Sequence, residues 1–177
     1  MFIRSFELEE TFRNIEPFSI NFRESLNIIV GENGSGKSTL LTLLSSKKPC
    51  KCKIDFEKGI QFKFFDTEKM NPRIKSNISG GFDVASRFMS HGQAIIALVK
   101  AIEDFENIVV FLDEPEAGVS LSNQKRLLES FTKAIKNNCQ LILTTHSYVL
   151  IQSVDEVFNL DSKTWVSSKI YLERVLR

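Results

Sequence analysis

Alternating hydrophobic and polar positions predict β-strands in the first third of the chain. Phe18, Ile20 and Phe22 alternate with polar residues, which is typical of a strand with one buried face. Two strands are expected at residues 2–13 and 18–24, and Pro17 marks the turn between them. The same alternation at Ile60, Phe62 and Phe64 predicts another half-exposed strand. We therefore expect an antiparallel β layer formed by residues 1–25 and 54–66.

Continuous apolar runs and helical periodicity follow in the rest of the chain. The apolar run at 108–112 is typical of a strand buried on both faces, a short strand is expected at 26–30, and two further buried strands are expected at 140–144 and 156–160. Helices are expected at the segments between and after them, namely 37–46, 93–105, 120–137 and the tail from residue 168, with a loop at 47–53. Strands that alternate with helices predict an α/β fold with a mostly parallel sheet flanked by helices.

Length and composition limit the functional classes. The 177 residues predict one domain, residues 1–177, in which residues 67–106 form a short helical lobe. A net charge of +1 excludes a strongly basic nucleic-acid-binding chain as the main theme. No apolar run approaches the roughly 20 residues of a membrane span, and no secretory signal is recognisable. Three cysteines are too few for a disulfide framework, so we expect reduced thiols and a cytoplasmic protein.

The strongest motif is a glycine-rich phosphate-binding loop between a predicted strand and a predicted helix. The segment GENGSGKS, residues 31–38, satisfies the pattern G-x-x-x-x-G-K-[ST]. Backbone N–H groups and the helix N-terminus would face phosphates, Lys37 would contact the β- and γ-phosphates, and Ser38 would ligate Mg²⁺. The expected nucleotide-binding residues are Gly31, Asn33, Gly34, Ser35, Gly36, Lys37, Ser38 and Thr39.

Acidic residues and a histidine follow two of the buried strands. Asp113 and Glu114 end the apolar run at 108–112, where Asp113 would hold Mg²⁺ and Glu114 would accept a proton from attacking water. A surface turn before Pro115 is the alternative for the two acids. His146 follows the strand at 140–144 and would approach the γ-phosphate, although a single histidine is more often a surface residue.

A fourth motif, MSHGQ at residues 89–93, opens a predicted helix. Ser90 and Gly92 alone would be ordinary helix-capping residues. Together with GENGSGKST, FLDEPEAG and THS, however, the segment resembles the nucleotide-binding domain of the ABC ATPase superfamily. The resemblance covers essentially the whole chain. The series of motifs is similar to that of small stand-alone ATPases related to RecF and SMC heads.

The resemblance implies a P-loop ATPase fold and assigns the motifs. Lys37, Glu114 and His146 correspond to catalytic residues, and residues 116–120 correspond to the D-loop that faces a partner subunit. Ser90, Gly92 and Gln93 correspond to the signature motif, which binds the nucleotide held by the other subunit. ATP would then be bound between two subunits of a head-to-tail homodimer.

Several positions depart from the family pattern. His91 and Met89 replace the usual Gly and Leu of the signature, and the Q-loop glutamine has no clear match. Asp66 or Glu68 could position Mg²⁺ or water in its place, and a solvated turn is an equal alternative. Phe12 and Arg13 are the candidates for the adenine contact.

The sequence allows several functions for the whole protein. It could hydrolyse ATP by itself, or act as an ATP-dependent dimerisation switch for an effector in DNA repair or phage defence. Ser90 follows Asp66 by only 24 positions, which leaves no room for the larger helical lobe of ABC transporter subunits. The lysines at 47–53 could contact nucleic acid, but a solvated loop is favoured, and Cys50 and Cys52 lack a second pair for a zinc site.

Overall fold

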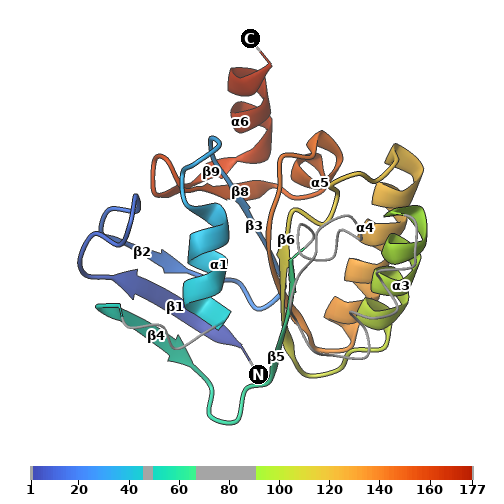
Figure 1. The fold of residues 1–177 in the computed structure, drawn as a ribbon, viewed down its shortest axis with the longest axis horizontal. Coiled ribbons are helices and arrows are strands. Elements are labelled where there is room, and N and C mark those ends of the chain that lie inside the picture. The colour runs from blue at the N-terminus through green and yellow to red at the C-terminus, as the bar shows by residue number, and fades with distance from the viewer. Residues whose placement is uncertain (1, 46–49, 67–90, 177) are drawn as a thin grey trace.

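Two β-sheets with helices between and beside them make up the fold (Figure 1). The computed structural model describes residues 2–45, 50–66 and 91–176, with only the backbone for residues 91–96. The expectations for Ser90 and Glu68, and for most of the lobe at 67–106, therefore lie outside the described residues.

The smaller sheet has three antiparallel strands in the order β2-β1-β4. These strands are β1 (Ile3–Leu8), β2 (Phe18–Asn21) and β4 (Cys52–Phe56). Phe18 and Ile20 are buried and the residues between them are exposed, so the predicted alternation is confirmed. The predicted lengths are wrong, because Glu9, Glu10 and Thr11 are all exposed and offer the sheet no apolar face.

The larger sheet has six strands in the order β5-β6-β7-β3-β8-β9. Neighbours from β5 to β8 run parallel, and β9 pairs antiparallel with β8. The strands are β3 (Leu26–Val30), β5 (Phe62–Asp66), β6 (Val109–Asp113), β7 (Gln140–Thr144), β8 (Glu156–Asn159) and β9 (Thr164–Ser167). The expected mostly parallel α/β fold is confirmed.

Successive residues of the central strands belong to two different hydrophobic cores. In β6, Val110 and Leu112 pack in one core, whereas Val109 and Phe111 pack in the other. In β7, Leu141 and Leu143 lie in the first core and Ile142 in the second. Both faces of these strands are therefore covered by apolar side chains, which explains why the sequence shows continuous apolar runs there.

Helices cover the two faces of the larger sheet. The first helix, α1 (Lys37–Ser45), lies between the two sheets, and its leucines join the core that contains β1 and β2 (Figure 1). On the opposite face lie α3 (His91–Glu103) and α4 (Leu121–Lys136), and α5 (Tyr148–Gln152) and α6 (Ser168–Val175) follow β7 and β9. None of the described helices has both the length and the apolar character required to cross a membrane.

The expected antiparallel layer is wrong for its second part. Of residues 54–66, only the part in β4 pairs with β1, whereas β5 pairs parallel with β6 along its whole length. Alternation indicates which face of a strand is buried but not the direction of its neighbour. Phe64 and Phe65 in fact pack against different cores. The expected loop at 47–53 is also wrong at its end, because β4 begins at Cys52.

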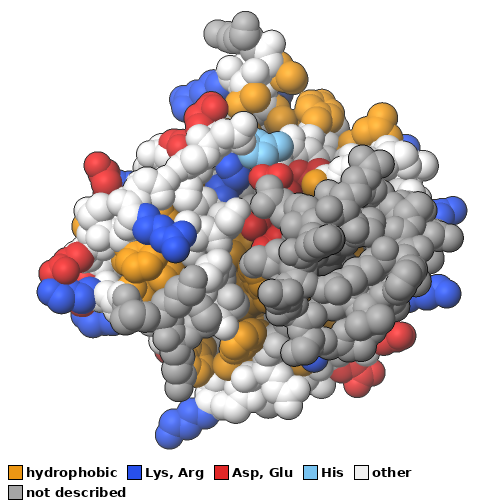
Figure 2. Space-filling view, viewed as in Figure 1, with side chains coloured by type: hydrophobic (Ala, Val, Ile, Leu, Met, Phe, Trp, Pro, Cys, Tyr) orange, Lys and Arg blue, Asp and Glu red, His pale blue; other side chains and the backbone are white. Residues whose placement is uncertain are grey.

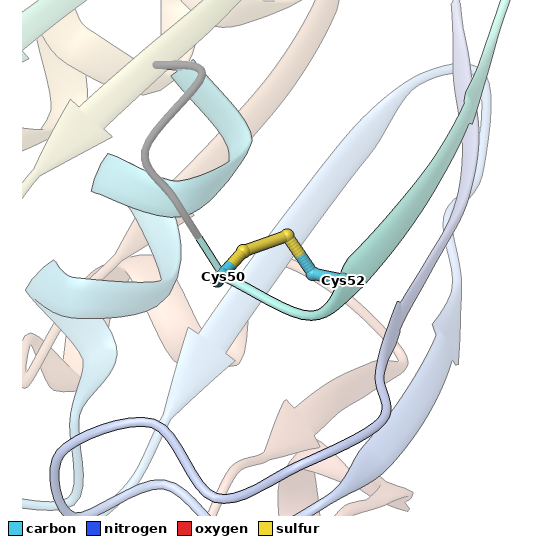
Figure 3. Close-up of a disulfide and its surroundings, with 2 residues drawn as sticks. All are labelled: Cys50 and Cys52. Carbon is cyan, nitrogen blue, oxygen red and sulfur yellow. A yellow bond between two sulfur atoms is a disulfide. The ribbon is translucent and has the colours of Figure 1, made fainter.

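The expected reduced state of all three cysteines is wrong for two of them. A disulfide joins Cys50 to Cys52 at the start of β4, beside α1 (Figure 3). Cys139 is free and buried. The expectation came from the odd number of cysteines, and such a count excludes a framework of several bridges but not one local bridge between residues two positions apart.

One buried side chain connects the two sheets. Gln140, at the start of β7, is fully buried. Its Oε1 accepts a hydrogen bond from Ile3 N at 2.8 Å, and its Nε2 donates to Ile3 O at 2.9 Å and to Arg23 O at 2.7 Å. The side chain therefore forms hydrogen bonds with backbone groups at the beginning of β1 and after β2. These groups belong to the smaller sheet and its connection, and they pair with no described strand of the larger sheet.

We predict that Gln140→Leu lowers the free energy of unfolding by about 2–4 kcal/mol, because it leaves these buried backbone groups unpaired. The measurement is the midpoint of urea unfolding. The control Gln61→Leu, at an exposed position, should change stability by less than about 0.5 kcal/mol. Equal stability of the Gln140→Leu and Gln61→Leu proteins would contradict the connecting role of Gln140.

Candidate functional site

The glycine-rich loop joins β3 to α1 at the carboxyl edge of the larger sheet. β3 is held between β7 and β8, so the loop begins at a fixed point next to the end of β7. Gly34 and Gly36 have φ values of +84° and +100°, which favour glycine. A Cβ on Gly36 would lie 2.4 Å from Ile15 Cγ1, so the loop packs closely on the turn before β2. Asn14 Nδ2 also donates a hydrogen bond to Gly34 O.

Lys37 lies inside this loop and carries a buried charge. Its side chain is 5% exposed, and Nζ donates to Gly31 O at 2.8 Å and to Glu32 O at 2.9 Å. Burial lowers the pKa of Lys37, and the negative charges of Glu114, Asp161, Asp113 and Glu32 oppose that shift. The ammonium is thus held among carbonyls and carboxylates at the edge of the sheet.

The loop fits an anionic ligand. Ser35 Oγ is buried and has no hydrogen-bond partner among the described residues, and α1 directs its N-terminus at the same place. Ser38 and Asn33 are exposed, and Thr39 is partly exposed. A phosphate in this loop would meet the lysine charge, an unpaired hydroxyl and the free N–H groups of a helix.

The two acids at the end of β6 differ in their surroundings. Asp113 Oδ1 accepts a hydrogen bond from Thr144 Oγ1 at 2.5 Å, across the parallel pair β6–β7. Glu114 has a left-handed backbone with φ of +48°, and its N–H donates to both Thr144 O at 3.1 Å and Thr144 Oγ1 at 3.2 Å. Thr144 therefore fixes both acids, and residues held in unusual backbone conformations often belong to functional sites.

His146 meets Glu114 at the ends of adjacent strands. His146 Nε2 lies 3.6 Å from Glu114 Oε1, and both side chains are about two-fifths exposed, at 42% and 41%. Burial raises the pKa of Glu114, His146 opposes the shift, and the nearby Glu116 and Asp113 add to it. In Figure 2, histidine, basic and acidic side chains gather together near the top of the face shown.

Asp66 reaches the same edge of the sheet. It is the last residue of β5 and is paired in register with Asp113 of β6. Among the described residues no group of three or more His, Cys, Asp and Glu side chains could hold a metal ion by itself. Mg²⁺ can also be bound by one or two protein groups together with substrate phosphates, and Ser38 and Asp113 are the candidate ligands for that arrangement.

Phe12 and Arg13 lie in the turn that contacts the glycine-rich loop through Asn14. The Arg13 guanidinium carbon is 5.8 Å from the centre of the Phe12 ring, and the next residue is the Asn14 that bonds to Gly34. Phe12 lines a cavity of about 440 Å³ together with Glu10, Thr11, Cys50 and Lys51. Of the signature residues, Gly92 and Gln93 lie in the first turn of α3, and only their backbone is described.

Three residues that the sequence motifs did not indicate contribute to the site, namely Thr144, Asp161 and Tyr171, the last through a hydrogen bond with the backbone of Gly31. Glu116, which was expected only as the first residue of the D-loop, contributes as well. Asp161 Oδ2 accepts a hydrogen bond from Glu32 N at 2.9 Å, and Glu116 accepts one from His146 N at 2.8 Å. Thr144 is adjacent to the THS motif, and Glu116 is inside the FLDEPEAG motif. Asp161 and Tyr171 follow no motif, so only the folded structure reveals them.

Family comparison identifies the class of domain. A model of the family described as "AAA domain, putative AbiEii toxin, Type IV TA system" matches residues 47–152, more than half of the chain. The chain belongs to this AAA family. A second family model, described as "AAA ATPase domain", matches residues 1–88 and includes the glycine-rich loop. The resemblance read from the motifs is therefore confirmed: this is a P-loop ATPase domain of the ABC/AAA type, and it binds ATP.

Curated relatives of this AAA domain are ABC-type ATP-binding proteins. The teichoic acids export ATP-binding protein TagH of Shouchella clausii is 24% identical over 171 residues, which cover 93% of this chain and 42% of TagH. The zinc import ATP-binding protein ZnuC of Haemophilus ducreyi is 28% identical over 165 residues, covering 77% of this chain and 62% of ZnuC. The chain thus spans about two-fifths to three-fifths of the length of these relatives.

Solved structures of ATP-binding cassettes share the fold. A nucleotide-free cassette from an ABC transporter superposes with a TM-score of 0.66 at 15% identity, covering 99% of this AAA domain and 95% of that chain. A cassette in its ADP conformation gives a TM-score of 0.59 at 15% identity, covering 90% and 87% of the two chains. At this identity the similarity establishes the fold alone.

We predict that Gly36→Ala weakens ATP binding by about tenfold or more, because the methyl group would collide with Ile15 and the φ value would be strained. Fluorescence titration with a labelled ATP analogue measures the affinity. Gly59→Ala is the matched control, because Gly59 has a similar φ of +82°, has open space around it and lies outside the loop. Equal affinity of both variants would contradict the close packing assigned to the loop.

Proposed function

We propose that this domain hydrolyses ATP in a Mg²⁺-dependent reaction at the loop 31–39 and the ends of β6 and β7. The supporting observation is the convergence of three elements: Lys37 from α1, and Glu114 and His146, 3.6 Å apart, from adjacent strand ends. Each of these groups has a task in phosphoryl transfer, which depends on positioning and on charge neutralisation.

The proposed roles follow from the surroundings of each side chain. Lys37 leaves the loop carbonyls and contacts the β- and γ-phosphates, and the N-terminus of α1 stabilises the same negative charge. Glu114, whose pKa is raised by burial, accepts the proton of the attacking water, and His146 contacts the γ-phosphate. Mg²⁺ held by Ser38 and Asp113 would neutralise charge on the phosphates. Phe12 and Arg13 contact the adenine.

A second copy of the chain completes the site in this proposal. Ser90, Gly92 and Gln93 of the lobe at 67–106 would contact the nucleotide bound by the other copy. Two large, exposed apolar side chains beside the site support a surface that a second copy would cover. Leu121, directly after the D-loop segment, is 67% exposed, and Tyr148, two residues after His146, is 48% exposed. Exposed apolar groups of this size favour protein contact.

The second candidate is a nucleotide-dependent switch that acts on an effector. The family description refers to a toxin of a type IV toxin–antitoxin system, and this favours a regulatory role over simple turnover. The similarity to TagH and ZnuC, an export and an import ATP-binding protein, supports a transport role as a further alternative. Slow turnover that rises with a soluble partner favours the switch, whereas stable copurification with a membrane protein favours transport. A gel shift with and without ATP tests nucleic acid as the partner.

We predict that Glu114→Gln retains ATP binding but lowers turnover by about 100-fold or more, because the amide cannot accept a proton. Phosphate release with and without Mg²⁺ measures turnover, and EDTA should abolish it. The control Glu106→Gln, at an exposed position after α3, should hydrolyse ATP at the wild-type rate. Undiminished hydrolysis by Glu114→Gln would exclude Glu114 as the general base.

We predict that Glu114→Gln also forms a stable dimer with ATP, because bound nucleotide is no longer lost by hydrolysis. Light scattering on a sizing column should show a mass that rises from about 20.2 kDa to twice that value on adding Mg-ATP. ADP should leave the monomer unchanged. A protein that binds ATP and remains a monomer would contradict the shared site between two copies.

A further inference from the structure

One carboxylate oxygen receives three hydrogen bonds directly behind His146. Glu116 Oε1 accepts from Thr145 Oγ1 at 2.6 Å, from His146 N at 2.8 Å and from Ser147 N at 3.2 Å. Thr145 is fully buried and Ser147 is 9% exposed, so the bonds from these two residues are partly shielded from water, whereas the bond from His146 N is exposed. A single side chain thus fixes the backbone on both sides of the histidine.

A second side chain closes this contact into a ring. Ser147 Oγ donates to Gln124 Oε1 at 2.6 Å, and Gln124 Nε2 donates to Val119 O at 3.1 Å. Val119 N in turn donates to Glu116 O at 2.9 Å. The segment after β6, the first turns of α4 and the segment after β7 are therefore joined by hydrogen bonds through Glu116, Gln124 and Ser147, in addition to apolar packing.

The ring contacts the histidine backbone and leaves the imidazole directed at Glu114. Glu116 bonds to His146 N, whereas His146 Nε2 lies 3.6 Å from Glu114 Oε1. Thr145 N donates to Ile29 O at 3.2 Å, which anchors the preceding residue to β3. The position of the imidazole relative to Glu114 therefore depends on where Glu116 holds residues 145–147.

The remaining oxygen of Glu116 shows that this arrangement has a cost. Oε2 is buried and has no hydrogen-bond partner within the described part of the chain. Burial of an unpaired carboxylate oxygen opposes folding, whereas the negative charge strengthens the three bonds at Oε1. Features that oppose stability locally are typical of functional sites.

We propose that Glu116 is a positioning residue of the ATPase site, which holds residues 145–147 so that His146 faces Glu114. The inference rests on the proposed ATP hydrolysis. Glu116 touches neither the phosphate-binding loop nor the reacting atoms in this proposal. It acts through the backbone of His146, and its loss should therefore affect the chemical step rather than nucleotide binding.

The test compares Glu116→Gln, which keeps the shape and one carbonyl acceptor, with Glu116→Leu, which keeps no acceptor. Glu129→Gln, at an exposed position on α4, is the matched control for loss of a carboxylate. Steady-state kinetics with Mg-ATP are measured at about pH 8, well above the usual pKa values of carboxyl groups. Hydrogen exchange of the amides of His146 and Ser147 is measured on the same proteins without nucleotide.

A neutral acceptor binds about half as strongly as a charged one, so Glu116→Gln should lower kcat by about tenfold and leave KM within about twofold. Exchange at His146 and Ser147 should accelerate by a similar factor, and Glu116→Leu should be more severe in both measurements. Glu129→Gln should match the wild type. If Glu116→Leu fails to fold, the Gln variant alone decides.

Two results would overturn the inference. One is a Glu116→Gln protein with wild-type kcat, and the other is a raised KM at unchanged kcat, which would place Glu116 in nucleotide binding. A wild-type chain that hydrolyses no ATP in the presence of Mg²⁺ would instead contradict the proposed function. Hydrolysis by the wild type together with an unaffected variant contradicts only the role of Glu116.

Discussion

The parallel alignment of β3, β6 and β7 is the constraint on which the rest of the structure depends. Because the three strands run the same way, the glycine-rich loop, the two acids and His146 all follow strand ends at one edge of the sheet. The alignment is stabilised by apolar side chains on both faces, which alternate between two cores. Residues that are more than a hundred positions apart in the sequence, such as Lys37 and His146, therefore lie at the same edge of the sheet.

Polar contacts then determine the geometry that apolar packing leaves undefined. Two buried cores set the positions of strand ends, but they do not orient the side chains beyond those ends. Thr144 connects Asp113 and Glu114 across β6 and β7, while Lys37 is retained by the carbonyls of its own loop. Three hydrogen bonds that Glu116 Oε1 accepts define the position of the segment that carries His146. The site is thus built from hydrogen bonds on a hydrophobic framework.

The sequence predicted the positions of the buried strands better than the contacts between strands and loops. Mostly apolar segments predicted the buried strands at 26–30 and 140–144 to the residue, because burial on both faces favours apolar residues at successive positions. The alternation at Phe62 and Phe64 could not reveal that β5 pairs with β6, since pairing direction is a long-range property. Motif spacing located Lys37, Glu114 and His146, whereas Asp161 bonds to Glu32 from a segment without a motif.

Some buried polar atoms lack hydrogen-bond partners, and they differ in whether a bound ligand can offset the cost of burying them. Within the described residues such side-chain atoms occur on Ser35, Glu116 and Ser168. Ser35 lies in the loop that faces phosphate, so a bound anion can satisfy its hydroxyl and recover the free energy lost in folding. Glu116 Oε2 belongs to the carboxylate whose other oxygen accepts the three bonds from residues 145–147, and the proposed function gives it no contact with the nucleotide. In this proposal the cost at Glu116 is linked to the position of His146, whereas a bound anion offsets the cost at Ser35.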